Sequence, residues 1–277
     1  MLNVLTVTDI VKRALEEDLG AGDITSMTLF SPADRGYGVI LAKQEGIIAG
    51  LPVAELVFKL CPPGCTLTPL VRDGSRVRAG QEVARVEGPL WAILGGERVA
   101  LNFLQRMSGI ATLTSLYVER VKPYKARICD TRKTVPGLRL LDKYAVRMGG
   151  GVNHRWNLGD AVLIKDNHLK AAGSIVQAIK RVREAIPFTT KVEVEAETLE
   201  QVAEALDGGA DLILLDNMEL AEIREAVKMA SGRALIEASG GITLDRVAEV
   251  AAAGVDFISV GALTHSVSAL DLSLELI

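Results

Sequence analysis

Six short apolar runs of this sequence each end in a residue that suits phosphate or cationic chemistry. The runs lie in the segments ICDTRK, VLIKDNH, KVEVEA, LILLDN, ALIEASGG and FISVGA. In a (β/α) barrel the carboxyl ends of the strands converge on one mouth, so side chains far apart in sequence meet there. A charge at one strand end is usually only solvated, but compatible groups at six successive ends favour a phosphate-handling barrel enzyme. The residues expected at this mouth are Arg132, Lys133, Lys165, Glu195, Asp216, Ser239 and Gly261.

Glycines follow the last two of these runs, in EASGGIT and SVGALTHS. Glycine directly after a strand lets backbone N–H groups approach a phosphate, and a helix opening at Thr243 would add its free donors and its dipole. Phosphate-binding barrels build this site from their last two strand-to-helix loops. A plain tight turn would also need glycine, but the position of both loops favours a phosphate cradle. Its expected members are Ser239, Gly240, Gly241 and Gly261.

Two carboxylates, Glu195 and Asp216, are predicted to end adjacent strands and to project into the same mouth. Two roles are open for them: they could hold Mg²⁺ that bridges a diphosphate, or they could face a cationic transition state directly. Glu193, one pleat earlier on the same face, could be a third ligand. A plainer alternative is that the two carboxylates only form ion pairs with Lys165 and Arg132. That arrangement is also compatible with catalysis.

The basic side of the expected site comes from DTRKT, where Arg132 precedes Lys133, and from GGGVNHRWNLGD, where His154 precedes Arg155. Arginine forks bind carboxylates in a bidentate manner. These basic residues, the phosphate loop and the carboxylate pair together predict a site that binds two substrates, one bearing carboxylates and the other bearing phosphates. For His154 alone a structural role is about as well supported as a ligand contact.

Hydrophobic periodicity predicts the elements that position these residues. Residues up to about 110 indicate a first helix ended by LGAGDIT, strands around GYGVILAKQEGIIAG, a helix at VAELVFKL and short strands joined by glycine turns. The stretch LGGERVALNFLQRMSGIATLTSLYVERV is typical of a buried helix pair. After Ala126, short buried runs alternate with helical segments, as in parallel βα units.

The chain is therefore expected to be an α/β protein with two domains. A smaller N-terminal α+β domain is predicted for residues 1–110, and an incomplete parallel α/β barrel with six strands for residues 111–267. The amphipathic C-terminal segment 268–277 is expected to pack back on the N-terminal domain.

Composition narrows the class of protein further. A chain of 277 residues, 49% of them apolar, can bury a large core, and a net charge of −4 argues against a general binder of nucleic acid or of membrane surfaces. No apolar run reaches the length of a bilayer-spanning helix. Three cysteines cannot all be paired, and Asp9, Lys12 and Arg13 stand at helical spacing near the start instead of a leader. These features predict a reduced, cytoplasmic protein.

Several long segments together resemble the signature of quinolinate phosphoribosyltransferase, also called carboxylating nicotinate-nucleotide pyrophosphorylase. They are EEDLGAGDIT, GERVALNFLQRMSGIAT, DTRKTVPGLRLLDKYAVRMGGGVNHRWNLGD, LIKDNH, VEVEAET, LLDN, EASGGI and SVGALTHS. The resemblance covers nearly the whole chain. It implies an N-terminal sandwich with an incomplete barrel, and a Mg²⁺-dependent reaction of quinolinate with phosphoribosyl pyrophosphate. The products would be nicotinate mononucleotide, pyrophosphate and CO₂, in NAD biosynthesis.

The resemblance also implies a role for each matching residue. The residues that would hold the two quinolinate carboxylates are Arg132, His154, Arg155 and, from the neighbouring subunit of a homodimer, Arg98. Those that would contact the pyrophosphate and the substrate carboxylate are Lys133 and Lys165. The acidic pair near Mg²⁺ and the ribose corresponds to Glu195 and Asp216. The 5′-phosphate cradle corresponds to Ser239, Gly240, Gly241 and Gly261.

Two other functions compete with this one. A relative of the same fold could act on another heteroaromatic acceptor or in molybdenum-related metabolism, but Arg98, Arg132, His154 and Arg155 are all retained. A barrel that only binds phosphorylated metabolites, without turnover, is disfavoured by the intact acidic pair.

Overall fold

The computed structural model describes residues 2–277, which form two compact units. One unit contains residues 2–115, 134–150 and 263–277, and the other contains residues 116–133 and 151–262. The sequence predicted a domain boundary near residue 110, with residues 268–277 returning to the N-terminal domain. The observed division differs, because residues 134–150, expected in the barrel domain, lie with the N-terminal residues.

The first unit contains an antiparallel sheet of four strands in the order β12–β1–β5–β3. The bounds are β1 (Arg35–Ala42), β3 (Thr66–Pro69), β5 (Glu82–Pro89) and β12 (Leu272–Leu276). A short antiparallel pair is formed by β2 (Gly46–Ile47) and β4 (Arg76–Val77). The last strand pairs with the first in register from Ala42–Leu272 to Gly38–Leu276, so the C-terminal segment is part of this sheet.

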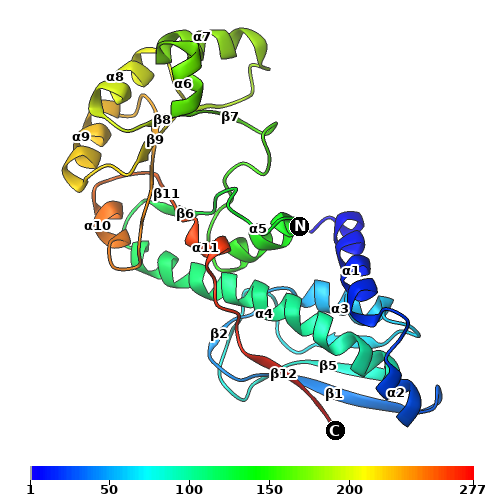
Figure 1. Cartoon of the computed structure of the whole chain (residues 1–277). Coiled ribbons are helices and arrows are strands. Elements are labelled where there is room, and N and C mark those ends of the chain that lie inside the picture. The colour runs from blue at the N-terminus through cyan, green and yellow to red at the C-terminus, as the bar shows by residue number, and fades with distance from the viewer. Residues whose placement is uncertain (1) are drawn as a thin grey trace. The chain divides into compact units, whose positions relative to one another are not determined.

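Helices accompany this sheet, and Figure 1 shows the longest of them lying along it. Their bounds are α1 (Val4–Leu19), α2 (Ile24–Leu29), α3 (Leu51–Leu60), α4 (Leu90–Val121), α5 (Arg139–Met148) and α11 (Ala262–His265). The first begins where the side chain of Asn3 accepts N–H groups of the first turn, and it ends at Gly20. The helices predicted at the N-terminus and at VAELVFKL are confirmed.

The expected buried helix pair is wrong, because α4 is one continuous helix of 32 residues. The glycines in it serve close packing and do not end it. A Cβ at Gly96 would lie 3.1 Å from the ring of Phe58, and one at Gly109 would lie 3.2 Å from Cα of Ala269, where the chain crosses the helix. Glycine at these positions therefore removes a clash, at a modest cost in helix propensity.

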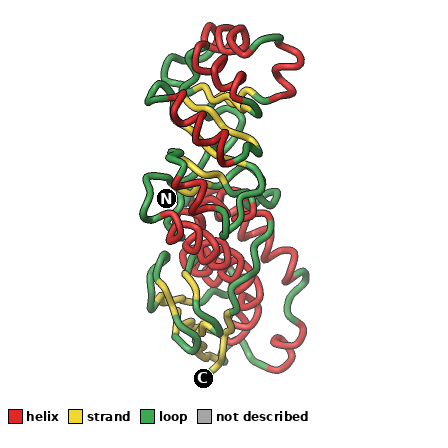
Figure 2. The backbone as a smooth tube through the Cα atoms, turned by 90° about the vertical axis from the view of Figure 1, so that its left-hand side faces the viewer, coloured by secondary structure: helices red, strands yellow, loops and turns green. Residues whose placement is uncertain are grey.

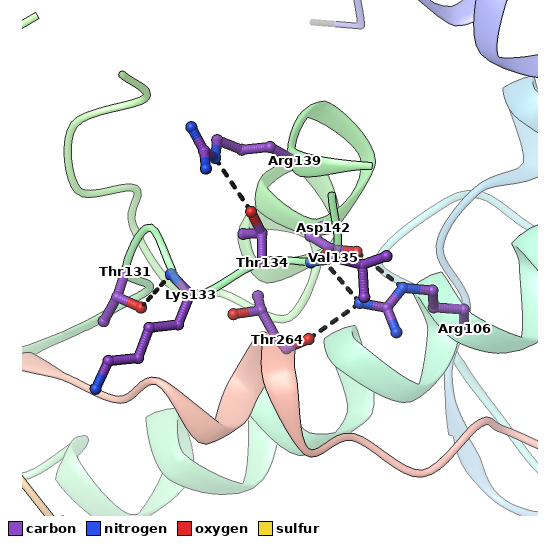
Figure 3. Close-up of polar contacts among 8 residues, drawn as sticks. All are labelled: Arg106, Thr131, Lys133, Thr134, Val135, Arg139, Asp142 and Thr264. Carbon is purple, nitrogen blue, oxygen red and sulfur yellow. Dashed lines mark hydrogen bonds and ion pairs between the residues drawn. The ribbon is translucent and has the colours of Figure 1, made fainter. Parts of the chain in front are cut away.

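A buried ion pair joins several segments of the first unit (Figure 3). Arg106 of α4 donates from Nε and Nη2 to the two carboxylate oxygens of Asp142 on α5, over 3.0 and 2.8 Å. Asp142 also accepts the backbone N–H of Val135, and Arg106 donates to the carbonyl of Thr264. Burial raises the pKa of Asp142, which has no exposed surface, while the hydrogen bond and the charge of Arg106 oppose that rise.

The second unit is built on a parallel sheet of six strands in the order β6–β11–β10–β9–β8–β7. The bounds are β6 (Arg127–Cys129), β7 (Val162–Ile164), β8 (Val192–Ala196), β9 (Leu212–Asp216), β10 (Leu235–Ser239) and β11 (Phe257–Ser259). These are the six predicted strands. Because β6 and β7 stand at the two edges, the barrel is incomplete, as expected.

Helices α6 to α10 lie on the outer side of this sheet, and Figure 2 shows them around the strands from a second direction. The bounds are α6 (Asp166–Ala172), α7 (Ile175–Ala185), α8 (Leu199–Asp207), α9 (Leu220–Ala230) and α10 (Val247–Ala252). The side chains of Ser174 and Thr198 accept backbone N–H groups at the starts of α7 and α8. No helix among residues 2–277 is long and apolar enough to cross a membrane.

Candidate active site

A pocket of about 400 Å³ lies at the carboxyl ends of the barrel strands, within the second unit. It brings together eight of the residues singled out from the sequence: Arg132, Lys133, His154, Arg155, Lys165, Glu195, Asp216 and Ser239. Four of them are basic, and the acidic members of the lining are Glu195, Asp216 and Glu237. A pocket of this size and charge suits small anionic substrates.

Lys165 and Glu195 form an ion pair at the mouth. The ammonium Nζ lies 2.7 Å from Oε2 of the carboxylate, and the Glu195 side chain is only 10% exposed, whereas that of Lys165 is 46% exposed. An ammonium group has three donors, so one bond to Glu195 leaves two for oxygens of a bound anion. The pair can therefore orient the carboxylate and still contact a substrate.

The segment before β7 is tied to the edge strand β6, and this places His154 and Arg155 in the pocket. Val152 forms a parallel bridge with Cys129. The fully buried carboxylate of Asp130 accepts both the side-chain amide of Asn153 and the backbone N–H of His154. These contacts fix the segment 152–154 at the open edge of the barrel. Sequence reasoning did not identify Asp130, since a contact 24 positions away leaves no local signal.

A hydrogen bond to the following loop holds the guanidinium of Arg155. Its Nη1 donates to the carbonyl of Ala161 over 3.0 Å. Burial and then the charge of Arg132 lower the pKa of Arg155, while the carboxylates of Glu193 and Asp160 raise it. Two guanidinium groups therefore share the pocket, and an anion bound between them relieves their repulsion.

Beneath the strand-end carboxylates lies a second acidic layer. Glu193 on β8 and Glu237 on β10 are both buried, and their carboxylates lie 3.1 and 3.7 Å from Nε2 of His154. Burial, followed by the charge of Glu193, raises the pKa of Glu237 to about 7. Sequence reasoning missed Glu237. The available signal was its place two residues before Ser239, which matches that of Glu193 before Glu195.

The glycine loop after β10 differs in part from the expectation. Gly240, at φ +93°, has no room for a side chain because Asn217 packs against it, whereas Gly241, at φ +57°, faces open space. The helix opening expected at Thr243 is wrong. Regular helix begins only at Val247, after a turn whose amides bond to the Thr243 carbonyl, and this helix has six residues. The cradle therefore has backbone and hydroxyl donors but no long helix behind it.

The other expected phosphate residues take different positions. Ser239 ends β10 and lines the pocket, whereas Gly240, Gly241 and Gly261 are not among the described residues that line it. They lie in the loops that directly follow β10 and β11. Arg98 is exposed on α4, in the other compact unit.

Comparison with known proteins identifies the family. Residues 23–108 match the model of the quinolinate phosphoribosyl transferase N-terminal domain, and residues 110–275 match that of the C-terminal domain. The chain belongs to the quinolinate phosphoribosyltransferase family. It is thus an enzyme, a phosphoribosyltransferase of the type that the sequence predicted.

Individual relatives resemble this family member over almost their whole length. A probable nicotinate-nucleotide pyrophosphorylase [carboxylating] of Bacillus subtilis is 43% identical, over 99% of this chain and 94% of its own. A nicotinate-nucleotide pyrophosphorylase [carboxylating] of Mycobacterium leprae is 46% identical, over 97% of this chain and 96% of its own. The crystal structure of NadC from Streptococcus pyogenes, 41% identical, superposes with a TM-score of 0.96 over 100% of this chain and 98% of that one.

Proposed function

We propose that this enzyme transfers the phosphoribosyl group of phosphoribosyl pyrophosphate to quinolinate and decarboxylates the adduct. The products are nicotinate mononucleotide, pyrophosphate and CO₂, in NAD biosynthesis. The observation that carries the proposal is one pocket in which four basic side chains surround the strand-end carboxylates Glu195 and Asp216. The match to both domains of the family supports the same reaction.

Quinolinate, a pyridine with two carboxylates, would bind on the guanidinium side of the pocket. Arg132 and Arg155 provide planar forks that match carboxylates, and His154 stands between Arg155 and the acidic layer. Holding the ring through both carboxylates fixes the direction of its nitrogen. That alignment lowers the entropic part of the barrier to a displacement between two substrates.

Phosphoribosyl pyrophosphate would bind between the glycine loops and the two lysines. Ser239 and the open backbone at Gly241 suit the 5′-phosphate, and Lys133 and Lys165 suit the pyrophosphate. In this orientation C1 of the ribose lies near Glu195 and Asp216. Their negative charge stabilises the positive charge that develops on the sugar as the bond from C1 to the pyrophosphate oxygen breaks.

Magnesium is proposed as the cofactor, because the donor set suits it. Glu195 and Asp216 end the neighbouring strands β8 and β9 and offer carboxylate oxygens within one pocket, and Mg²⁺ prefers one or two carboxylates plus substrate oxygens. These two residues would hold the ion, directly or through water. When bound, it would neutralise charge on the pyrophosphate oxygens.

The two chemical steps then follow in order. The pyridine nitrogen attacks C1 as pyrophosphate leaves with the bonding electron pair, and the nitrogen becomes cationic. The bond from C2 to its carboxylate then breaks, CO₂ leaves, and the electron pair remains on C2 until a proton replaces the lost group. Since the adjacent nitrogen is positive, the protein need supply no separate electron sink.

We further propose a homodimer in which Arg98 of each subunit completes the pocket of the other. The exposure of Arg98 on α4 and the family resemblance support this. A reducing compartment such as the cytoplasm is proposed from the cysteines. No disulfide joins Cys61, Cys65 or Cys129 in the described residues 2–277.

Product analysis tests the proposed function. The purified protein is incubated with quinolinate, phosphoribosyl pyrophosphate and Mg²⁺, and nicotinate mononucleotide is measured by chromatography. Formation of the nucleotide only when all three are present is expected. Binding of both substrates without any product would instead support a non-catalytic barrel.

A further inference from the structure

The acidic layer of Glu193 and Glu237, of which Glu237 also lines the pocket, has no part in the chemistry described above. We propose that Glu193 and Glu237 are positioning residues, which hold the imidazole of His154 and, through it, the adjoining Arg155 in the substrate pocket. The proposal rests on the proposed function, because quinolinate is the ligand whose binding would report on these two side chains.

The hydrogen bonds of His154 define its protonation. Its Nδ1 accepts the backbone N–H of Arg155 over 2.7 Å, so this nitrogen carries no proton. The proton of the neutral ring is then on Nε2, which faces Oε2 of Glu193 at 3.1 Å. Glu193 is therefore the acceptor that fixes the orientation of the ring, and Glu237 approaches the same nitrogen to 3.7 Å.

Burial of these two acids is costly for the fold. Oε1 of Glu193 is buried and has no hydrogen-bond partner among residues 2–277. Burying a carboxylate with unsatisfied oxygens costs free energy. The neighbouring strand carries Leu214 in register with Glu237, which shows that an apolar side chain fits this layer. The two acids are therefore not needed for packing of the core, and we attribute them to a role in the site.

The protonation states limit the charge of this layer. With its pKa near 7, Glu237 is protonated for part of the time at neutral pH, and in that form its carboxyl group can donate a hydrogen bond. The carboxylate of Glu193 lies nearer to Nε2 of His154 than that of Glu237 does, so its charge acts most directly on the ring. That charge also acts on Arg155, whose guanidinium it stabilises. The layer therefore supports the cationic wall of the pocket without strongly repelling an anionic substrate.

A metal ion is the competing interpretation of the same cluster. One donor atom from each of His154, Glu193 and Glu237 lies within 4.8 Å of the others, a spacing that a metal ion could bridge. Metal binding requires a lone pair on Nε2. The bond from Arg155 to Nδ1 places the proton on Nε2 and so favours the hydrogen-bond network.

Substitutions of matched shape separate hydrogen bonding from packing. Glu193→Leu removes the acceptor for Nε2, whereas Glu193→Gln keeps an acceptor oxygen without the charge. Replacing a buried acid by an apolar residue of similar volume is often neutral for folding, and circular dichroism and a thermal melt check this. Glu204→Gln, on the exposed face of α8, is the control.

Steady-state kinetics gives the first readout. For Glu193→Leu we expect KM for quinolinate to rise about tenfold, the scale of one lost hydrogen bond, while KM for phosphoribosyl pyrophosphate changes less than about twofold. Glu193→Gln should recover most of the loss. Glu237→Leu should also raise KM for quinolinate, because it removes the second carboxylate that approaches Nε2. Unchanged quinolinate KM in both leucine variants would overturn the proposal.

Nitrogen-15 NMR of the histidine side chains gives a second readout that needs no activity. The chain has three histidines, so a His154→Asn variant assigns the ring signals of His154. We expect a neutral ring protonated at Nε2 in the wild type, and loss of this single form in Glu193→Leu. A ring protonated at Nδ1, or one whose signals shift when Zn²⁺ is added, would overturn the proposal in favour of the metal site.

The two readouts distinguish this proposal from the proposed function. If the wild type fails to turn over quinolinate, the function is wrong, and the NMR experiment still decides the state of the His154 ring. If the wild type is active and the NMR signature is absent, only the positioning roles of Glu193 and Glu237 are rejected.

Discussion

Replacing Arg106 by alanine should destabilise the first unit strongly, because it leaves the Asp142 carboxylate buried and unpaired. The carboxylate has no exposed surface and receives two of its hydrogen bonds from Arg106, whose side chain is 25% exposed (Figure 3). Breaking a buried pair from one side costs about 3–5 kcal/mol, and the partial exposure of Arg106 places the expected loss near the lower end. The carbonyl of Thr264 also loses its donor.

The assay is chemical unfolding of wild type and variant, followed by circular dichroism. Arg120→Ala, an exposed arginine in the last turn of the same helix, is the control and should lose less than about 1 kcal/mol. A double-mutant cycle with Asp142→Asn isolates the coupling between the two side chains. If Arg106→Ala is no less stable than the control, or if the cycle shows no coupling, the reasoning about this pair is wrong.

Four further predictions concern the site. Nicotinic acid should not replace quinolinate, because removal of the 2-carboxylate leaves cationic groups unpaired, so comparable turnover of the two acids would reject the assignment of the basic wall. Glu195→Ala or Asp216→Ala should lower kcat far more than it weakens quinolinate binding, as measured by titration, since these carboxylates act on charge that appears in the transition state. Mixing inactive Arg98→Ala with inactive Arg132→Ala subunits should restore about a quarter of wild-type activity after random exchange, because half the dimers are mixed and half their sites are whole; no recovery after proven exchange would exclude a shared site. Glu237 binds its proton more tightly in the folded state, with a pKa of about 7 against 4.5, so its contribution to stability is complete below pH 4.5 and is lost as the pH rises through 7; unfolding curves of Glu237→Gln should lack this loss.

The strand-end residues could be predicted because their positions follow from one geometric rule. Parallel strands end at the same edge, so Lys165, Glu195, Asp216 and Ser239 had to converge once the six strands were recognised. The same rule, applied one pleat further in, would have identified Glu237. That residue was missed because its segment was interpreted through its glycines.

Other features depend on contacts that the sequence does not encode locally. Gly109 could equally end a helix or allow close packing, and only the crossing chain at Ala269 shows that it does the latter. The buried acids Asp130 and Asp142 are hydrogen-bonded to residues 24 and 36 positions away. Local periodicity places such residues on a strand end or a helix but does not reveal their partners.

Turnover of quinolinate labelled with ¹³C in its 2-carboxylate tests the proposed reaction most directly. With phosphoribosyl pyrophosphate and Mg²⁺, the enzyme should release labelled CO₂ and pyrophosphate in equal amounts and form unlabelled nicotinate mononucleotide. Release should stop when phosphoribosyl pyrophosphate is omitted, because decarboxylation needs the cationic nitrogen. Labelled CO₂ without the phosphoribosyl donor, or a nucleotide that keeps the label, would contradict the proposed reaction.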